Sequence, residues 1–365
     1  MRFVITLGVI FLLSSCGIDD TIDGNDGDNG SSSDWEKEWG SEDVDRLYSI
    51  AVSPDDTVYV GGKTFGDLYS EKEGESDAFL AAFNLKGKEL WGKQWSVKDD
   101  RSDVQGLVVD DAGNIYAGGG DNPFIMKFSP DGTKIWEKFP EVDSVLCLAL
   151  DNSGNVYAGT GYGDILKFSP EGKELWHYNI STEDAEGEIK ALAVDSEGNI
   201  YAGGTTWGSL FEENAGGTDA FLVKIAPDGA HVWKKQWGGK GDDSVYAIAA
   251  DGTKNIYVAA GSFEESEVLA KYSPEGKKIW GYTEEQSHYS SIAIDNENSI
   301  YFGSGGYNDR IHRYNSDGEK IWSSNDAGET KWSAIGIALD SNGNLYICGG
   351  AKENHLKKIL ASEMK

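Results

Sequence analysis

Hydrophobic and polar positions follow one pattern that recurs seven times along this chain. Each copy has an apolar run that ends in or beside Asp, a short polar turn, and a second apolar run that carries Tyr and closes on a small residue or Gly. Apolar runs bounded by polar turn residues predict paired β-strands. The first and last anchor tyrosines, Tyr59 and Tyr346, lie six periods apart, or about 48 residues per copy. The copies occupy 50–62, 107–119, 148–160, 192–204, 248–261, 292–305 and 337–350.

A second pair of strands follows each hairpin. In the clearest copy, 219–229 reads DAFLVKIAPDG and 230–237 reads AHVWKKQW. The turn between them returns as Ser-Pro-Asp-Gly or Ser-Pro-Glu-Gly at 129–132, 169–172 and 273–276. Pro presets φ for such a turn, and Gly supplies a positive φ. Each copy therefore predicts a four-stranded antiparallel meander whose innermost strand is covered on both faces.

Tryptophans mark the outermost strand and predict how the copies close. The last copy reaches only its third strand, at about 356–360, whereas WEKEWG at 35–40 matches the outer strands that begin at Trp91 and Trp233. We therefore predict an all-β fold, a seven-bladed β-propeller over 35–365. The N-terminal strand completes the last blade, so that no long strand edge stays unpaired. The predicted outer-strand tryptophans are Trp91, Trp136, Trp176, Trp233, Trp280 and Trp322.

The copies resemble the bacterial β-propeller repeats of the SBBP type. The fourth copy, 189–244, carries the resemblance most clearly, with IKALAVDSEGNIYAGG at its start. The second and third copies are shorter and resemble the PQQ-like propeller repeat, as in NVYAGTGYGDILKFSPEGKELW at 155–176. The resemblance implies the fold over about nine-tenths of the chain. It leaves the activity open, because one propeller fold carries many unrelated functions.

The N-terminus predicts export and a lipid anchor. Arg2 precedes an apolar run of 11 residues, which suits a signal-peptide core and is shorter than the ~20 residues of a membrane span. Leu-Ser-Ser-Cys at 13–16 resembles the bacterial lipobox, which implies cleavage before Cys16 and lipid attachment to its sulfur. We therefore divide the chain into a lipoprotein signal peptide, 1–15, a flexible acidic linker, 16–34, and the propeller. An ordinary signal peptide that happens to hold a Cys is the alternative.

Composition narrows the class of protein. Acidic residues outnumber basic ones by 62 to 32, a net charge of −30, which repels nucleic acids and anionic lipid headgroups. With only 3 Cys and 5 His, neither a disulfide scaffold nor a Cys- or His-rich metal centre is indicated. Cys147 and Cys348 fall in strands of blades that are not neighbours, so we expect two buried thiols rather than a disulfide. We expect a monomer.

Loops between the second and third strands are candidate ligand sites. In the first and fourth copies these loops are markedly longer than in the others and hold aromatic side chains. Exposed aromatic side chains on long loops suit stacking on a sugar ring or a partner chain. Alternatively, the loops fold back over their own blades. The candidate ligand-face residues are Phe65, Tyr69, Trp207 and Phe211 in these loops, together with Trp332, which lies just before the last inner strand.

Acidic residues also recur just before the inner strands. Asp45, Asp143 and Asp243 occupy the same position of the repeat, seven residues before the end of the inner apolar run. Asp103 and Glu188 occupy the next position of the repeat. A ring of carboxylates at the mouth of a central channel could hold Ca²⁺ or attract a cationic partner. Capping of the turns is the alternative, which we favour. We expect no resident metal or other cofactor, with Ca²⁺ as the one alternative.

No catalytic motif is evident. The histidines show no metal-ligand spacing, and the chain lacks GxSxG, P-loop and dinucleotide-binding glycine motifs. A lyase-like site would need His288 with Glu284 or Glu285, and loop composition accounts for that pair equally well. The adjacent Cys pair of many quinoprotein propellers is absent.

These observations predict a non-catalytic, lipid-anchored β-propeller that binds an unidentified protein or carbohydrate partner. We expect it in the periplasm or on the surface of a bacterium, most naturally at the outer membrane. One alternative is an outer-membrane assembly-type scaffold lipoprotein. Another is a propeller enzyme of lyase or quinoprotein type.

Overall fold

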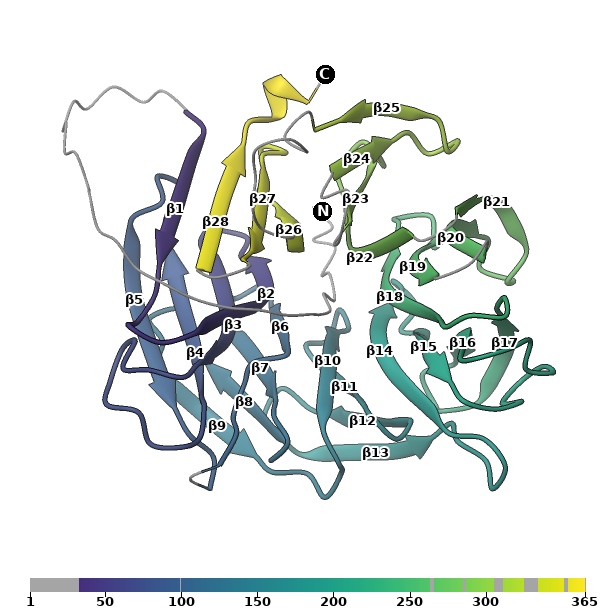
Figure 1. Cartoon of the computed structure of the whole chain (residues 1–365), viewed down its shortest axis with the longest axis horizontal. Coiled ribbons are helices and arrows are strands. Elements are labelled where there is room, and N and C mark those ends of the chain that lie inside the picture. Colours follow the sequence, from purple (N-terminus) through teal and green to yellow (C-terminus); the bar gives the residue numbers. More distant parts are fainter. Residues whose placement is uncertain are drawn as a thin grey trace.

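Twenty-eight β-strands form seven four-stranded antiparallel blades around a ring in the part of the chain that the structure describes (Figure 1). This computed structural model describes residues 33–98, 100–262, 266–284, 287–304, 311–324, 334–350 and 354–364. The seven innermost strands contact one another in a closed cycle. The predicted seven-bladed propeller is therefore confirmed.

The blades follow one another along the chain and are numbered in that order. Blade 1 consists of β2 (Asp45–Val52), β3 (Val58–Thr64), β4 (Asp77–Phe83) and β5 (Glu89–Trp95). Blade 2 consists of β6 (Gly106–Val109), β7 (Ile115–Gly119), β8 (Phe124–Phe128) and β9 (Lys134–Lys138). Blade 3 consists of β10 (Val145–Leu150), β11 (Val156–Thr160), β12 (Asp164–Phe168) and β13 (Glu174–Asn179). Blades 4 and 5 consist of β14 (Gly187–Val194), β15 (Ile200–Thr206), β16 (Asp219–Ile225) and β17 (His231–Trp237); and β18 (Asp243–Ala250), β19 (Ile256–Ser262), β20 (Ser266–Tyr272) and β21 (Lys278–Glu284). Blades 6 and 7 consist of β22 (Ser287–Ile294), β23 (Ile300–Ser304), β24 (Ile311–Tyr314) and β25 (Lys320–Ser323); and β26 (Ala334–Leu339), β27 (Leu345–Gly349), β28 (Asn354–Ile359) and β1 (Trp35–Trp39), with the 3₁₀ helix η2 (Ala361–Glu363) at the end.

The N-terminal strand closes the ring, as the sequence predicts. β1 pairs antiparallel with β28 along its whole length, from Trp35 opposite Lys358 to Trp39 opposite Asn354. The indole Nε1 of Trp35 donates to the Leu85 carbonyl in blade 1 at 2.9 Å. The two ends of the repeat array are therefore joined by main-chain pairing and by side-chain contact with the next blade.

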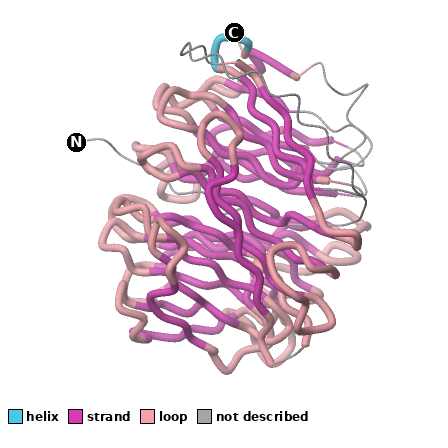
Figure 2. Tube along the Cα trace, turned by 90° about the vertical axis from the view of Figure 1, so that its left-hand side faces the viewer, coloured by secondary structure: helices cyan, strands magenta, loops and turns pink. Residues whose placement is uncertain are grey.

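The strands run between two faces of connecting segments (Figure 2). Because each blade is an antiparallel meander, the short turns after the first and third strands lie together on one side, here called the turn face. The connections after the second and fourth strands lie on the other side, here called the loop face. The two faces are built differently, and that difference positions the candidate site.

In six of the seven blades one Asp organises the turn between the first and second strands, and in blade 1 Ser53 takes its place, its hydroxyl accepting the backbone N–H of Thr57 at 3.0 Å. Asp195 Oδ1 accepts the backbone N–H groups of Glu197 at 2.9 Å and Asn199 at 3.0 Å, and the buried hydroxyl of Tyr201 donates to Asp195 Oδ2 at 3.1 Å. Gly198 adopts φ +81° in this turn, a conformation that favours glycine. The Asp and Tyr of the repeat are thus one structural unit, which recurs around Asp110, Asp151, Asp251, Asp295 and Asp340.

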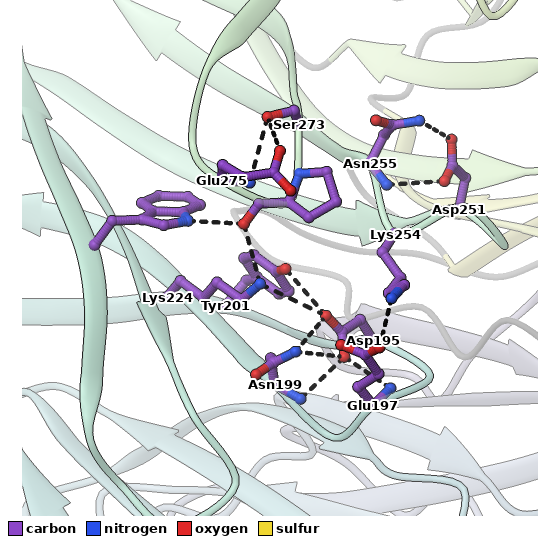
Figure 3. A network of polar contacts seen from close by, with 12 residues as sticks. Asp195, Glu197, Asn199, Tyr201, Lys224, Asp251, Lys254, Asn255, Ser273 and Glu275 are labelled. Atoms are coloured by element: carbon purple, nitrogen blue, oxygen red, sulfur yellow. Dashed lines mark hydrogen bonds and ion pairs between the residues drawn. The ribbon is translucent and has the colours of Figure 1, made fainter.

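Polar side chains also join neighbouring blades on the turn face (Figure 3). Lys224 lies over the Tyr201 ring, 5.1 Å from its centroid, and donates to the Pro274 carbonyl of blade 5 at 3.0 Å. The Nε1 of Trp233 donates to the same carbonyl at 3.0 Å. We call the bond from an outer-strand Trp to the next blade's turn the latch. It recurs from Trp35 to Leu85, Trp91 to Pro130, Trp136 to Pro170, Trp280 to Ser316 and Trp322 to Glu363.

The junction of blades 3 and 4 has no latch. The Nε1 of Trp176 is buried and finds no acceptor among the described residues. A Cβ on Gly276 would lie 2.8 Å from the Trp233 ring, whereas one on Gly229, at the same place in blade 4, would meet nothing within 4 Å. The Tyr178 hydroxyl and His231 Nε2 make a contact at this junction instead. The turn of blade 4 therefore stands away from Trp176.

Candidate functional site

The long loops of blades 1 and 4 fold back over their own blades. Gln94 Oε1 accepts the backbone N–H groups of Leu68 at 2.9 Å and Tyr69 at 3.0 Å, and Gln236 Oε1 accepts that of Phe211 at 2.9 Å. The Tyr69 ring packs on Phe79, with centroids 6.3 Å apart, and Phe211 packs on Phe221 at 5.8 Å. Tyr69 and Phe211 are half-buried, so for these two residues the structure agrees with the alternative that the long loops fold back over their own blades.

The other aromatic candidates differ from one another in exposure. Phe65 is half-buried, with Lys63 Nζ 5.5 Å from its ring centroid. Trp207 is 59% exposed and follows directly after β15 on the loop face. Tyr162, which the sequence reasoning missed, is also 59% exposed, in the short loop between β11 and β12. Trp332 lies outside the described residues.

Tyr162 and Trp207 border the same connection between blades 3 and 4. The Ser181 hydroxyl donates to the Tyr162 carbonyl at 3.1 Å. On the other side of this connection, a Cβ on Gly208, the residue after Trp207, would lie 3.0 Å from Ala185. The connection therefore carries an exposed aromatic residue on each flank. The exposure of Tyr162 could have been predicted from the sequence, because this Tyr stands between two glycines in a loop that is too short to fold back over its blade.

The predicted acidic residues make two kinds of contact, according to their position in the repeat. Asp45 and Asp243 cap turns: Asp45 Oδ2 accepts the backbone N–H of Ser41, and Asp243 Oδ2 accepts that of Gly239 at 2.7 Å. Asp143 accepts the Ser144 hydroxyl at 2.7 Å. The residues one place later form ion pairs instead: Asp103 with Lys63 at 3.9 Å, and Glu188 with Lys190 at 3.1 Å. Asp45 and Asp243 are the first residues of their strands and Glu188 is the second residue of its strand. Because alternate residues of a strand point to opposite faces, Glu188 does not share a ring with Asp45 and Asp243.

Inner-strand side chains of blades 4 to 6 contact one another near the loop face. Tyr246 stacks on His288 of the next blade, with ring centroids 4.3 Å apart and 28° between the planes. Lys190 Nζ of the preceding blade lies 5.3 Å from the Tyr246 centroid. Burial, and secondarily the charge of Lys190, lowers the pKa of His288 to about 4. His288 is therefore neutral at neutral pH. Glu285 lies outside the described residues, and the Glu284 side chain is not described.

In the part of the chain that the structure describes, polar atoms without a hydrogen-bond partner recur near the loop-face ends of the inner strands in several blades. Burial, offset in part by Lys63, raises the pKa of Asp103 to about 6, and its Oδ1 has no hydrogen-bond partner. Native structures pair the great majority of buried polar atoms, so these unpaired atoms call for an explanation, which water or a ligand can supply. Within the described residues, the unpartnered atoms here are Arg46 Nε, Asp103 Oδ1, Gln105 Oε1, Asp143 Oδ1, Asp243 Oδ1 and His288 Nε2.

One group of described residues has the composition of a metal site. Glu36, Glu38 and His355 bring one ligand atom each within 4.8 Å of one another, on the paired strands β1 and β28. In the structure His355 Nδ1 lies 3.2 Å from a Glu38 carboxylate oxygen, an ion-pair contact that accounts for the grouping without a metal. Cys147 and Cys348 are buried free thiols, in blades 3 and 7. No helix in the described ranges has the length and apolar character needed to cross a bilayer.

Comparison with known proteins agrees with the architecture. A family model described as the SBBP β-propeller repeat matches residues 185–212, at the start of blade 4. Among solved structures, the WD40 β-propeller domain of Doa1 is similar, with a TM-score of 0.61 and 12% sequence identity over 91% of this chain and 97% of that one. No curated protein matches the sequence. At this identity the structural likeness concerns the fold alone.

Proposed function

We propose, on the premise that the chain is a β-propeller repeat protein, that it is a non-catalytic binding module whose loop face holds a cationic segment of a protein partner. The observation that carries this proposal is that polar atoms near the loop-face ends of the inner strands lack a hydrogen-bond partner among the described residues in several blades. Four of the six are acceptors, the carboxylate oxygens of Asp103, Asp143 and Asp243 and the Gln105 carbonyl oxygen. A guanidinium or ammonium group donates to such atoms in short, charge-assisted bonds.

The exposed aromatic residues support the same face. Among the described residues of this face, Trp207 and Tyr162 are the two most exposed large apolar side chains. Trp and Tyr are enriched among residues that dominate binding energy, because they bury a large area with few rotatable bonds. On the turn face, by contrast, the Asp–Tyr–Lys–Trp groups already bond to one another and to the next blade. Polar groups that are free to hydrogen-bond to a partner protein therefore lie on the loop face.

We also propose that Cys16 carries a lipid that tethers the propeller to an extracytoplasmic bacterial membrane. Cys16 and most of the linker 16–34 lie outside the described residues. The described chain enters the fold at Trp35, whose side chain bonds to Leu85 in a turn of the turn face. A flexible linker of this length spans about 25 Å on average. The tether would thus hold the turn face nearest the membrane and leave the loop face available to partners.

Two experiments test these proposals. Crosslinking in intact cells, followed by purification, should recover a partner with the wild type and with Ile279→Ala, which removes an exposed apolar residue from an outer strand. Recovery should fall several-fold with Trp207→Ala and with Asp103→Asn. Equal recovery from all four proteins would exclude the loop face as the binding surface. For the anchor, Cys16→Ala should release the protein from membranes on fractionation, and continued membrane association would contradict lipidation.

A further inference from the structure

A cleft of about 560 Å³ opens on the side of the propeller between blades 1 and 2. Trp95, Met126 and Phe128 supply much of its apolar surface. The Trp95 ring packs on Phe128 of blade 2, with centroids 5.6 Å apart, and edge-on to Phe124 at 5.9 Å. Tyr69 lines the cleft as well, whereas Trp207, Tyr162 and Asp103 do not, so the cleft is a separate surface from the one proposed to bind a cationic segment.

The cleft exists because a long blade lies beside a short one. β5 has seven residues, whereas β8 and β9 of blade 2 have five each. Two other blades carry a Trp at the place of Trp95, and there the next blade covers it. Trp39 donates to the Tyr69 hydroxyl at 3.1 Å, and Trp237 donates to the Glu267 carbonyl at 3.4 Å. In the described structure, blade 2 packs Phe124 and Phe128 on the Trp95 ring and offers no acceptor for its N–H.

Trp95 is consequently left with an unused donor. Its Nε1 is buried and has no acceptor among the residues that the structure describes. An unsatisfied buried donor costs roughly as much as a lost hydrogen bond. A carbonyl or carboxylate oxygen of a ligand that reached this N–H would satisfy it. The equivalent donors of Trp39 and Trp237 show that such a bond belongs to this position in the repeat.

The charge around the cleft is opposite to that of the chain as a whole. Lys93, Lys98 and Lys134 line it, in a protein of net charge −30. Lys134 pairs with Glu137 of the same strand. Within the described ranges, Lys93 and Lys98 form no ion pair. Two lysines beside an aromatic surface favour a ligand that combines negative charge with apolar groups.

The cleft also follows an exposed strand edge. Every residue from 92 to 98 lines it, although alternate side chains of a strand point to opposite faces. A cleft that is lined by residues from both faces of the strand must run along the edge of the strand itself. β5 is the outermost strand of blade 1 and pairs only with β4, so its outer N–H and C=O groups can pair with an added strand.

We propose that this cleft binds an extended acidic segment of a partner protein. The segment lies along β5, places an apolar side chain against Trp95 and Phe128, and sets its carboxylates against Lys93 and Lys98. A backbone carbonyl or a carboxylate of the segment accepts the Trp95 N–H. This surface acts independently of the loop face, and so extends the function proposed above to a second partner or a second contact.

The test measures fluorescence anisotropy of labelled eight-residue peptide pools with the full-length protein in detergent. One pool alternates Asp or Glu with Ile, Val or Phe, and a matched pool has Lys in place of the acids. The acidic pool should bind, and Lys93→Glu should weaken that binding at least tenfold. Lys235→Glu, at the same place in blade 4, should leave it unchanged. Equal binding of the two pools, no binding of either, or equal effects of the two variants would overturn the proposal.

Two further arms separate the binding role from a structural one. Trp95→Phe keeps an aromatic ring and removes the N–H, so it should weaken binding about three- to tenfold without lowering the thermal midpoint. Trp237→Phe should leave binding unchanged. A loss of peptide binding in Trp207→Ala would move the site to the loop face and refute the cleft. Binding of an oligogalacturonate, an acidic glycan, with no binding of the acidic peptides would refute the peptide and assign the cleft to carbohydrate.

Discussion

Replacement of Trp233 by Phe should destabilise the propeller more than the same replacement of Trp176. The two residues occupy the same place in adjacent blades, and each packs on its own blade's Tyr with ring centroids about 6 Å apart, 6.0 Å for Trp233 and 5.9 Å for Trp176. They differ in the latch: Trp233 Nε1 donates to the Pro274 carbonyl at 3.0 Å, and Trp176 Nε1 is buried without an acceptor in the described structure. The pair therefore isolates the latch from the ring packing.

The size of the difference follows from the two environments. Trp233→Phe removes a hydrogen bond with a net value of about 0.5–1.5 kcal/mol. The Pro274 carbonyl keeps Lys224 as a donor at 3.0 Å, so no acceptor is left unpaired. Trp176→Phe instead removes an unpaired buried donor, which recovers roughly 1–3 kcal/mol. The loss of ring area is shared by both variants, so their free energies of unfolding should differ by about 2–4 kcal/mol.

Thermal unfolding followed by far-UV circular dichroism measures this difference. Unfolding entropies near 2 cal/mol/K per residue, over about 330 ordered residues, convert 2–4 kcal/mol into a gap of about 3–6 °C between the two midpoints. Trp136→Phe, which removes a latch to Pro170 of 2.9 Å, should behave like Trp233→Phe. Equal losses in the Trp176 and Trp233 variants would show that the latch adds nothing to stability, and would refute the reasoning.

Three other predictions concern turns, closure and pH. Gly276→Ala should destabilise more than Gly229→Ala in urea unfolding, because both have φ above +70° but only the Gly276 Cβ would approach a Trp ring; equal losses would contradict this. Deletion of 35–39 removes the strand paired with β28 and should lower the thermal midpoint by several degrees; an unchanged midpoint would exclude its role in closure. The folded-state pKa of Asp103, about 6, lies above its ordinary value of 3.8, so its contribution to stability is present below pH 4 and is lost as pH rises to 6. The folded-state pKa of His288, about 4, lies below its ordinary value of 6.5, so the contribution of His288 to stability is present above pH 6.5 and is lost as pH falls to 4. Between pH 4 and 6.5, Asp103→Asn should therefore make stability rise more steeply with pH and His288→Gln less steeply, and unchanged slopes in urea titrations would contradict both.

The repeat made most of the fold predictable. A Tyr such as Tyr201 and the Asp before it recur because they bond to one another in the turns of six blades, so periodicity alone locates the second strand and the turn. The closing strand was predictable for a similar reason, since Trp35 and Trp39 repeat the spacing of an outer strand. These features follow from interactions within one blade or between identical neighbours, which a single sequence repeats as a readable pattern.

The site was less predictable because it depends on relations between blades. Inner strands carry one additional residue that breaks their register with the second strand, as at Lys190 and Tyr246, and these residues make the contacts near His288. The spacing of the repeat in the sequence does not reveal this shift in register. Gln94 likewise gives no signal that its carboxamide binds the loop around Tyr69, although its recurrence as Gln236 beside the other long loop could have indicated a shared role.

Departures from the repeat separate structural from functional residues. Trp95 and Trp176 each lack a hydrogen bond that their counterparts make, and each leaves a buried donor unpaired within the described structure. Trp95 lines a cleft beside two lysines, whereas Trp176 does not line that cleft. Phe at either position should therefore preserve or raise stability, while only Trp95→Phe should weaken ligand binding. If Trp95→Phe also left binding unchanged, the missing bond would be a tolerated defect of a long blade beside a short one, and the cleft would have no role in recognition.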